Sequence, residues 1–324
     1  MGDKRFHGSV KSDTAQTKRV LDSLAKWRES NETADTAAFS FVSGDENMRA
    51  IKQHQSSEDW VWAAIRDEAA LDSDQEPVLA SFLHSIILNH ASLEEALSYL
   101  LAGKLTNLSL PSITLRDIIM EAMADDPQLG IRAREDICAV RERDPACSFY
   151  SAPLLYYKGF HALQSHRVSH WLWRRKRRTL ALCLQNRASE VFNVDIHPAA
   201  RIGGGIFIDH GSSLVIGETA IVENNVSMLQ EVTLGGTGKE SGNRHPKIRT
   251  GVLISAGAKI LGNVEVGANA KVAAGSVVLE DVPSGCTVAG VPAKLVGHCA
   301  KLQQPALDMD HNIPTGDQGR RRGI

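Results

Sequence analysis

The chain has 324 residues, of which 43% are hydrophobic and 23% are charged, and its formal net charge is −2. This near-neutral balance gives no indication of binding to nucleic acid or to a membrane surface, and no apolar stretch is long enough to span a bilayer. The five cysteines contain no CxxC pair and are scattered along the chain, which favours reduced thiols and a cytoplasmic location over a disulfide framework.

Residues 1–55 are polar and mixed in charge, with few large apolar side chains. Such a composition does not support a buried core, so we expect a disordered extension with a short helix in TKRVLDSLAKWRES. Met48 lies just before the first strongly patterned segment and is an alternative start.

Residues 56–192 carry apolar residues at helical spacing and are expected to form an all-α domain. In SLEEALSYLLAGKL, Ser92 stands three residues before Glu95, which is the pattern of a capping box, and the helix is expected to stop near Gly103. The run RRKRR at 174–178 is interpreted as a solvated helix face in preference to a nucleic-acid site.

From residue 193 the period changes to six. A six-residue repeat is typical of a parallel β-helix, in which each hexad is one short strand with a turn and three hexads make a triangular coil. We therefore expect residues 193–298 to form a β-helix, so the fold class is α+β. The repeated aliphatic positions are Ile196, Ile202, Ile208, Ile216, Val222, Met228, Leu234, Ile254, Ile260, Val266, Val272 and Val278.

The six-residue rhythm breaks twice, and each break carries a histidine. It slips by two residues across DHGSS, which contains His210, and it stops over residues 235–251, which contain His245. A solenoid accepts insertions at its corners without disturbing the stack, and loops displayed on a rigid scaffold are common places for chemistry. The sequence therefore predicts an extruded, glycine-rich loop at 235–251.

Five segments carry a resemblance to a known family: DIHPAARIGGGIFIDHGSSLVIGETAIVENNVS, VTLGGTGK, RHPKIR, GAKILGNVEVGANAKVAAGSVV and AGVPAKLVG. Together they resemble the serine O-acetyltransferases, which are hexapeptide-repeat acyltransferases. The resemblance continues upstream through RDPAC and LLYYKGFHALQSHRVSHWLW. It implies a left-handed β-helix and the transfer of acetyl from acetyl-CoA to the hydroxyl of L-serine, giving O-acetyl-L-serine and CoA in the first step of cysteine biosynthesis.

The resemblance implies a general-base mechanism through a ternary complex, with three catalytic residues. His210 matches the base that accepts the proton of the serine hydroxyl. Asp195 matches the carboxylate that orients this imidazole, and the two are expected to meet on adjacent strands or corners. His245 matches a second active-site histidine, which contacts substrate and helps to polarise the transition state.

Substrate contacts are implied in the same way. Asp144 and Asp209 match carboxylates that hold the ammonium group of L-serine, and Arg244 matches the cation for its carboxylate. Acetyl-CoA is expected in a groove between adjacent prisms as the acyl-donor substrate, and no metal is implied. The residues expected to line this groove are Gly236, Thr237, Ser255, Ala256 and Ala274, with Lys271 and Lys294 for the phosphates.

The resemblance also implies partners. We expect a homotrimer or a dimer of trimers with active sites between subunits, and feedback inhibition by L-cysteine, which carries sulfur in place of the serine oxygen. Residues 299–324 are expected to form a flexible tail whose terminal Ile324 matches the residue that enters the active site of O-acetylserine sulfhydrylase. The triplet Arg320–Arg322 departs from the tails of that family.

Three alternatives stay open. Some hexapeptide β-helices are zinc carbonic anhydrases, and His197, His210 and His245 are three histidines in the right region. A second alternative is another acyl acceptor, such as homoserine or a sugar. A third is a scaffold role through the tail, which is compatible with activity. His197 and Glu218 are interpreted as structural, with Glu218 pairing with a cation.

Overall fold

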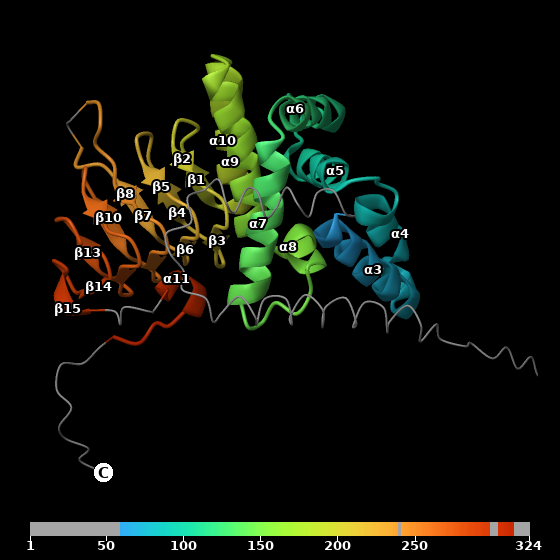
Figure 1. Cartoon of the computed structure of the whole chain (residues 1–324). Helices are drawn as coiled ribbons and strands as arrows, with labels where there is room; N and C mark the ends of the chain where they lie inside the picture. The colour runs from blue at the N-terminus through green and yellow to red at the C-terminus, as the bar shows by residue number, and fades with distance from the viewer. Residues whose placement is uncertain (1–58, 239–240, 299–303, 314–324) are drawn as a thin grey trace, which may run out of the picture. The chain divides into compact units, whose positions relative to one another are not determined.

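The computed structural model describes residues 59–238, 241–298 and 304–313, so the expectations for residues 1–55 and for Ile324 lie outside the described residues. Helices form the first part of the described chain and strands the second (Figure 1). The helical elements are α3 (Trp60–Gln75), a 3-10 turn (Pro77–Leu79), α4 (Ala80–Leu83), a π turn (His84–Leu88), α5 (Leu93–Leu105), α6 (Ser112–Asp125), α7 (Gln128–Arg143), α8 (Ser151–Tyr156), α9 (Lys158–Arg174) and α10 (Arg178–Phe192).

Helix α5 begins where the capping pattern predicts. The Ser92 hydroxyl accepts a hydrogen bond from the Glu95 N–H (3.3 Å), and the Glu95 carboxylate accepts one from the Ala91 N–H (3.0 Å). These bonds satisfy amide groups that lack partners at the start of a helix. None of the helices in the described ranges is long and apolar enough to cross a bilayer.

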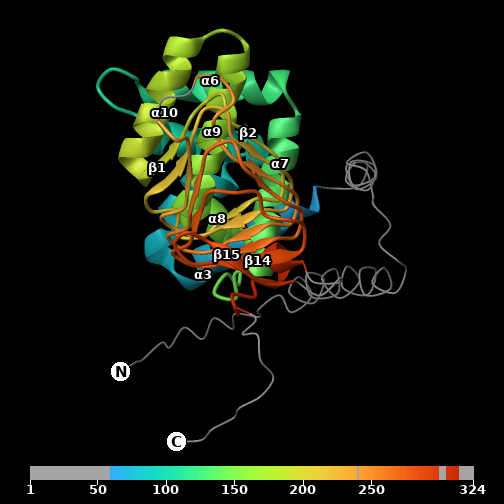
Figure 2. The same ribbon diagram turned by 90° about the vertical axis from the view of Figure 1, so that its left-hand side faces the viewer.

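The strands stack into three sheets that form the faces of a left-handed parallel β-helix, as predicted. The sheets have the orders β1-β4-β7-β10-β13, β2-β5-β8-β11 and β3-β6-β9-β12-β14-β15, and only the β14–β15 pair is antiparallel within the described strands. Figure 2 shows the coils lying over one another when the stack is viewed from its β14–β15 end. The strands are β1 (Val194–Ile196), β2 (Arg201–Ile202), β3 (Phe207–Ile208), β4 (Leu214–Ile216), β5 (Ile221–Val222), β6 (Ser227–Met228), β7 (Thr233–Gly235), β8 (Lys247–Ile248), β9 (Leu253–Ile254), β10 (Lys259–Leu261), β11 (Glu265–Val266), β12 (Lys271–Val272), β13 (Val277–Val278), β14 (Cys286–Ala289) and β15 (Lys294–His298).

The predicted aliphatic positions fill the inside of the prism, and all of them are buried. Each such side chain contributes about 1.5–3 kcal/mol when it is fully removed from water. The rhythm resumes one repeat earlier than the sequence indicated, because Ile248 is fully buried and pairs with Val222 and Val266. The extruded loop is therefore shorter than 235–251, since β7 ends at Gly235 and β8 begins at Lys247.

A buried ion pair joins two helices to the first coil. The Asp136 carboxylate of α7 accepts hydrogen bonds from the Arg167 Nη2 (2.7 Å) of α9 and from the Ile206 N–H (2.9 Å), which precedes β3. The Arg167 guanidinium also donates to the Gly203 carbonyl (2.8 Å). The two side chains are 0% and 3% exposed, so the pair is closed to water. Its bonds fix the start of β3, the strand that leads to His210.

Part of the tail is ordered, which corrects the expectation of a flexible segment from residue 299. Residues 304–313, here called the C-terminal strap, contain α11 (Pro305–Asp308) and lie against the β3-containing sheet. Ala306 is fully buried, and its carbonyl accepts a hydrogen bond from the Ser227 hydroxyl (2.7 Å). Met309 packs against a cluster that includes Phe207. The sequence concealed these contacts, because the apolar residues of the strap are interspersed with polar ones, although Pro305 and Ala306 are buried.

We expect Asp136→Ala to destabilise the protein by about 3–5 kcal/mol, because it leaves the buried Arg167 charge without its partner. The measurement is urea unfolding followed by circular dichroism. Glu190→Ala is the matched control, since the Glu190 carboxylate pairs with Arg187 at the surface (2.9 Å) and its loss should change stability much less. Equal losses in the two variants would contradict this account.

Candidate active site

His210 lies at the corner that follows β3. It has φ +57°, a left-handed conformation that is uncommon outside glycine, and the Gly211 N–H closes the turn on the Asp209 carbonyl (2.6 Å). The His210 side chain is 71% exposed, and its Nε2 lies 3.6 Å from the Asp209 carboxylate, beyond hydrogen-bond distance. The imidazole is therefore open to receive a proton from a bound molecule.

Asp144 joins Asp209 and His210 in a group that we call the acidic half-site. Asp144 directly follows α7, and its carboxylate accepts hydrogen bonds from the Ala146 N–H (2.8 Å) and from the Tyr157 hydroxyl (3.0 Å). Burial raises the pKa of Asp209 and nearby Asp144 raises it further, whereas His210 lowers it. Two neighbouring carboxylates with an open histidine form a site suited to a cation.

The His245 side chain is held in place at a different corner of the prism. Its ring lies against Gly217, where an added Cβ would overlap the imidazole. Thr219 anchors the same turn, because its hydroxyl accepts hydrogen bonds from the N–H groups of Arg244 (3.0 Å) and His245 (3.1 Å). The sequence indicated the histidine but neither Gly217 nor Thr219, although both stand in the quoted segment that contains IGETA.

The contacts of His245 define its tautomer. The Thr219 N–H donates to Nδ1 (3.2 Å), and the Thr219 hydroxyl lies 2.9 Å from the same nitrogen. A nitrogen that accepts carries no proton, so the neutral ring carries its proton on Nε2. Burial lowers the pKa of His245 and the neighbouring Arg244 lowers it further, which favours this neutral form. His245 is therefore a hydrogen-bond donor at Nε2.

Arg244 and His245 together form what we call the basic half-site. The Arg244 Nη2 donates to the Glu218 carboxylate (2.8 Å), and this bond lowers the pKa of Glu218. Glu218 thus has a cationic partner, as expected from the sequence. A guanidinium has five N–H donors, so the ion pair with Glu218 leaves others for a second carboxylate.

The two half-sites lie on opposite edges of the sheet that begins with β1. His210 precedes β4, whereas Gly217, which the His245 ring contacts, follows it. The step from Leu214 to Gly217 alone spans about 10 Å of strand. One chain therefore does not bring His210 and His245 together.

The expected pairing of Asp195 with His210 is wrong within one chain. The Asp195 carboxylate accepts a hydrogen bond from the Gln185 Nε2 of α10 (2.6 Å), and in the described chain it has no hydrogen bond or ion pair with His210. The reason is geometric, because Asp195 lies in the middle of β1 and pairs with Val215. Burial lowers the pKa of His197, and the charges of Glu218 and then Asp195 oppose this shift.

His197 has a structural environment. Its ring packs edge-on against Trp173, with ring centroids 5.1 Å apart, and its Nδ1 accepts a hydrogen bond from the Ala199 N–H (3.1 Å). His197 and His210 lie at different corners of one chain, and the zinc alternative takes its three histidines from neighbouring chains. Throughout residues 59–238, 241–298 and 304–313, no group of three His, Cys, Asp or Glu side chains is arranged to hold a metal.

The residues expected to bind acetyl-CoA divide between the same two edges. Ser255, Ala256 and Ala274 follow β9 and β12 on the edge of His210, whereas Gly236 and Thr237 follow β7 on the edge of His245. Lys294 is exposed on β15.

Lys271, which the sequence places at the CoA phosphates, lies beneath the strap in this structure. Its Nζ donates to the backbone carbonyls of Asp310 (2.8 Å) and Asn312 (2.7 Å), and the residue is 4% exposed. Ser255 is bonded to the strap as well, since its hydroxyl lies 3.1 Å from the His311 Nδ1. The strap thus covers the outer face of this sheet beside the acidic half-site.

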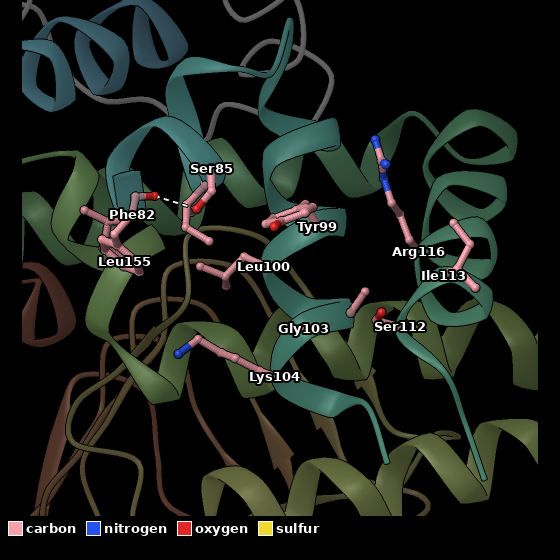
Figure 3. Close-up of a pocket in the computed structure, with 12 residues that line it drawn as sticks. Phe82, Ser85, Tyr99, Leu100, Gly103, Lys104, Ser112, Ile113, Arg116 and Leu155 are labelled. Carbon is pink, nitrogen blue, oxygen red and sulfur yellow. Dashed lines mark hydrogen bonds between the residues drawn. The ribbon is translucent and has the colours of Figure 1, made fainter. Parts of the chain in front are cut away.

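A cavity of about 440 Å³ lies among the helices and does not include either half-site. Tyr99 and Leu100 of α5 line it together with Ile113 and Arg116 of α6 (Figure 3). His210 and His245 lie elsewhere, at corners of the prism.

Comparison with known proteins shows the family of the chain. Residues 61–165 match the family model of the serine acetyltransferase N-terminal region, and residues 245–280 match the model of bacterial transferase hexapeptide repeats. A serine acetyltransferase of Escherichia coli (strain K12) is 57% identical over 253 residues, which cover 78% of this chain and 92% of that protein. The chain belongs to the serine acetyltransferase family. It is therefore an acyltransferase, as the resemblance implied.

Solved structures of serine acetyltransferases have the same fold. One in complex with cysteine has a TM-score of 0.77 and 58% identity, covering 78% of this chain and 98% of that one. Another, from Brucella abortus strain S19 in complex with coenzyme A, has a TM-score of 0.75 and 52% identity, covering 76% of this chain and 98% of that one. Two ligands of the family are thus known from bound structures of relatives.

We expect Gly217→Ala to lower acyltransferase turnover on the order of 100-fold, because the new methyl group displaces the His245 ring from its seat. Turnover is measured as CoA release, with circular dichroism as the check on folding. Gly103→Ala is the control, since a Cβ there meets open space. Unchanged turnover in folded Gly217→Ala would contradict a role for the observed position of His245.

Proposed function

We propose that this chain transfers the acetyl group of acetyl-CoA to the hydroxyl of L-serine, giving O-acetyl-L-serine and CoA. The observation that carries the proposal is the pair of half-sites, which together supply every group that the reaction needs. A zwitterionic acceptor requires anions for its ammonium and a cation for its carboxylate, and the hydroxyl requires a base. The name shared by the relatives supports the same reaction.

The complete site forms between two subunits of a homotrimer. Each chain carries the acidic half-site on one edge of the β1-containing sheet and the basic half-site on the other, so a neighbour is needed to unite them. In a ring with three-fold symmetry every interface joins the first edge of one subunit to the second edge of the next. Each trimer then has three equivalent sites.

L-Serine is held by charges of both signs. Asp144 and Asp209 of one subunit bind its ammonium, and Arg244 of the next binds its carboxylate through the N–H groups that Glu218 does not use. Both carboxylates need to be ionised for this task. Burial raises the pKa of Asp209, and the arriving ammonium favours its charged form.

His210 is the general base of a direct transfer in the ternary complex. As the serine oxygen attacks the thioester carbon, the proton of the hydroxyl moves to the imidazole. Asp195 from the adjacent subunit is the carboxylate that orients this ring and stabilises its protonated form. The tetrahedral intermediate then collapses with cleavage of the carbon–sulfur bond, and the protonated His210 returns its proton to the leaving CoA thiolate.

His245 stabilises the charge that develops in this step. Its Nε2–H is held in place by the bonds of Thr219 to Nδ1, and its neutral form is favoured by burial. A fixed donor aimed at a developing oxyanion stabilises the transition state more than the ground state. The two histidines therefore have different roles, because His210 accepts a proton and His245 donates a hydrogen bond.

Acetyl-CoA lies in the groove between adjacent prisms, where both edges contribute. Gly236 and Thr237 approach from one subunit, and Ser255, Ala256 and Ala274 from the other, with Lys294 near the phosphates. The relative that binds coenzyme A supports this donor. Ser255 is hydrogen-bonded to His311 of the strap in this structure, so one residue of the proposed groove also contacts the strap.

L-Cysteine is the expected feedback inhibitor, because it carries the same ammonium and carboxylate as L-serine. A relative has been solved in complex with cysteine, which supports occupation of the same charged pocket. Binding of O-acetylserine sulfhydrylase through Ile324 stays a prediction from the resemblance.

Two trimers pair through the helical elements in this proposal. Several large apolar residues are exposed there, among them Ile113 (62%) and Tyr99 (40%), which line the cavity of Figure 3. Burial of such side chains between copies would remove apolar surface from water.

The reaction is tested by measuring CoA release from acetyl-CoA with L-serine, and in parallel with homoserine and a simple sugar. We expect release with L-serine alone and suppression of that release by added L-cysteine. Release with homoserine or the sugar, and none with L-serine, would overturn the proposed acceptor while leaving the acyltransferase family assignment intact.

Mixed trimers test the shared site. Subunits carrying His210→Ala are combined in equal amounts with subunits carrying His245→Ala, and neither variant alone should turn over substrate at an appreciable rate. If each site takes one histidine from each neighbour, every mixed trimer regains one intact site, and random mixing restores about a quarter of the wild-type rate. No recovery in verified mixed trimers would show that both histidines act from the same chain.

A further inference from the structure

Tyr157 makes a specific bond to a carboxylate of the acidic half-site. Its hydroxyl donates to the Asp144 Oδ2 (3.0 Å), while the other carboxylate oxygen accepts from the Ala146 N–H (2.8 Å). One donor on each oxygen fixes the plane of the carboxylate, which would otherwise rotate about its Cβ–Cγ bond. The remaining lone pairs are left for a ligand.

The tyrosine is itself held in place by its neighbours. It is the residue directly before α9, and its ring packs against the buried cluster of Val140, Cys147 and Phe207. Val140 lies in α7, which ends next to Asp144, and Phe207 lies in β3, which leads to Asp209. Tyr157 therefore packs against a cluster to which both segments that carry the carboxylates contribute.

The first turn of α9 also secures the other side of the acidic half-site. The Lys158 Nζ donates to the Ser212 hydroxyl (2.6 Å) in the turn after His210. Gly159 lies directly against the Ile208 carbonyl, where a Cβ would overlap the oxygen. The position of Tyr157 relative to Asp209 and His210 is therefore set by direct contacts of the next two residues.

The hydroxyl of Tyr157 acts as a neutral donor. Burial and the hydrogen bond to Asp144 raise the pKa of Tyr157 well above its ordinary value, so the proton stays on the phenol oxygen. Asp144 and Asp209 repel each other, since each is an anion and Asp144 raises the pKa of Asp209. The hydrogen bond from Tyr157 thus places a neutral donor on Asp144 beside a second carboxylate.

We propose that Tyr157 is a positioning residue for acceptor binding, which holds the Asp144 carboxylate in the orientation that receives the ammonium group of the acceptor amino acid. This inference rests on the proposed function, because it assigns the task of Asp144 to the ammonium of L-serine. Tyr157 acts through Asp144 and touches neither the reacting hydroxyl nor acetyl-CoA. Its removal should weaken binding of the acceptor and leave the chemical step and the donor site unchanged.

The test compares Tyr157→Phe with Tyr156→Phe. The first variant removes the hydroxyl and keeps the ring that packs on Phe207, so the fold should be retained. The second removes the same atom from the preceding residue, whose side chain is 59% exposed and has no hydrogen bond within the described residues. Both variants are assayed as the full chain with acetyl-CoA and L-serine, with thermal unfolding as the check on folding.

For Tyr157→Phe we expect KM for L-serine to rise about 10-fold, which is the effect of losing one hydrogen bond to a charged group. The kcat at saturating L-serine and KM for acetyl-CoA should change by less than about 2-fold. Tyr156→Phe should match the wild type. An unchanged KM for L-serine, or a loss confined to kcat, would overturn the inference.

A double-mutant cycle separates positioning from a general structural role. If Tyr157 acts through Asp144, adding Tyr157→Phe to Asp144→Asn should produce no further rise in KM for L-serine. Additive effects would overturn the inference, and so would a Tyr157→Phe chain that fails to fold while Asp144→Asn folds normally. The wild-type protein is assayed before the variants are compared. If it does not acetylate L-serine, the proposed function is refuted instead of this inference.

Discussion

The buried bond between Asp136 and Arg167 is the interaction on which the rest of the site depends. It ties α7, α9 and the first coil of the solenoid at one point, with both side chains closed to water. Asp144 directly follows α7, Tyr157 directly precedes α9, and β3 leads to His210. Such a pair adds little stability compared with apolar residues of the same size, but breaking it is costly. Its consequence here is geometric, because it joins the three elements beside which Asp144, Tyr157 and His210 lie.

The solenoid then determines what one chain can achieve. Each coil places its turns on three edges, and equivalent turns of successive coils lie above one another. His210 and His245 stand on different edges, so a single prism holds two incomplete sites. In the proposed trimer, assembly and activity are linked, since the proposed acceptor site forms only where two prisms meet. Loss of assembly should therefore remove turnover without unfolding the subunit core.

The two histidines differ in environment, and this difference supports the roles that we propose for them. His245 is buried against Gly217 and is hydrogen-bonded at Nδ1, which leaves one fixed proton at Nε2. His210 is exposed on a left-handed corner with a carboxylate nearby. A fixed donor and an open base are the two functions that acyl transfer to a hydroxyl requires. The strap adds a further boundary to this region, because it covers Lys271 and bonds to Ser255.

The sequence by itself determined the β-helix, since the six-residue period requires buried aliphatic positions at Ile196 and its successors, and it determined the capped start of α5 at Ser92. Its motifs also singled out His210 and His245. Only the tertiary structure decided that within one chain Asp195 meets Gln185 and not His210, that Ile248 resumes the repeat, and that Lys271 lies beneath the strap. These outcomes depend on contacts between coils and between distant segments. Spacing along a chain specifies the face of a strand, but the partner across that face is chosen by the packing of the whole molecule.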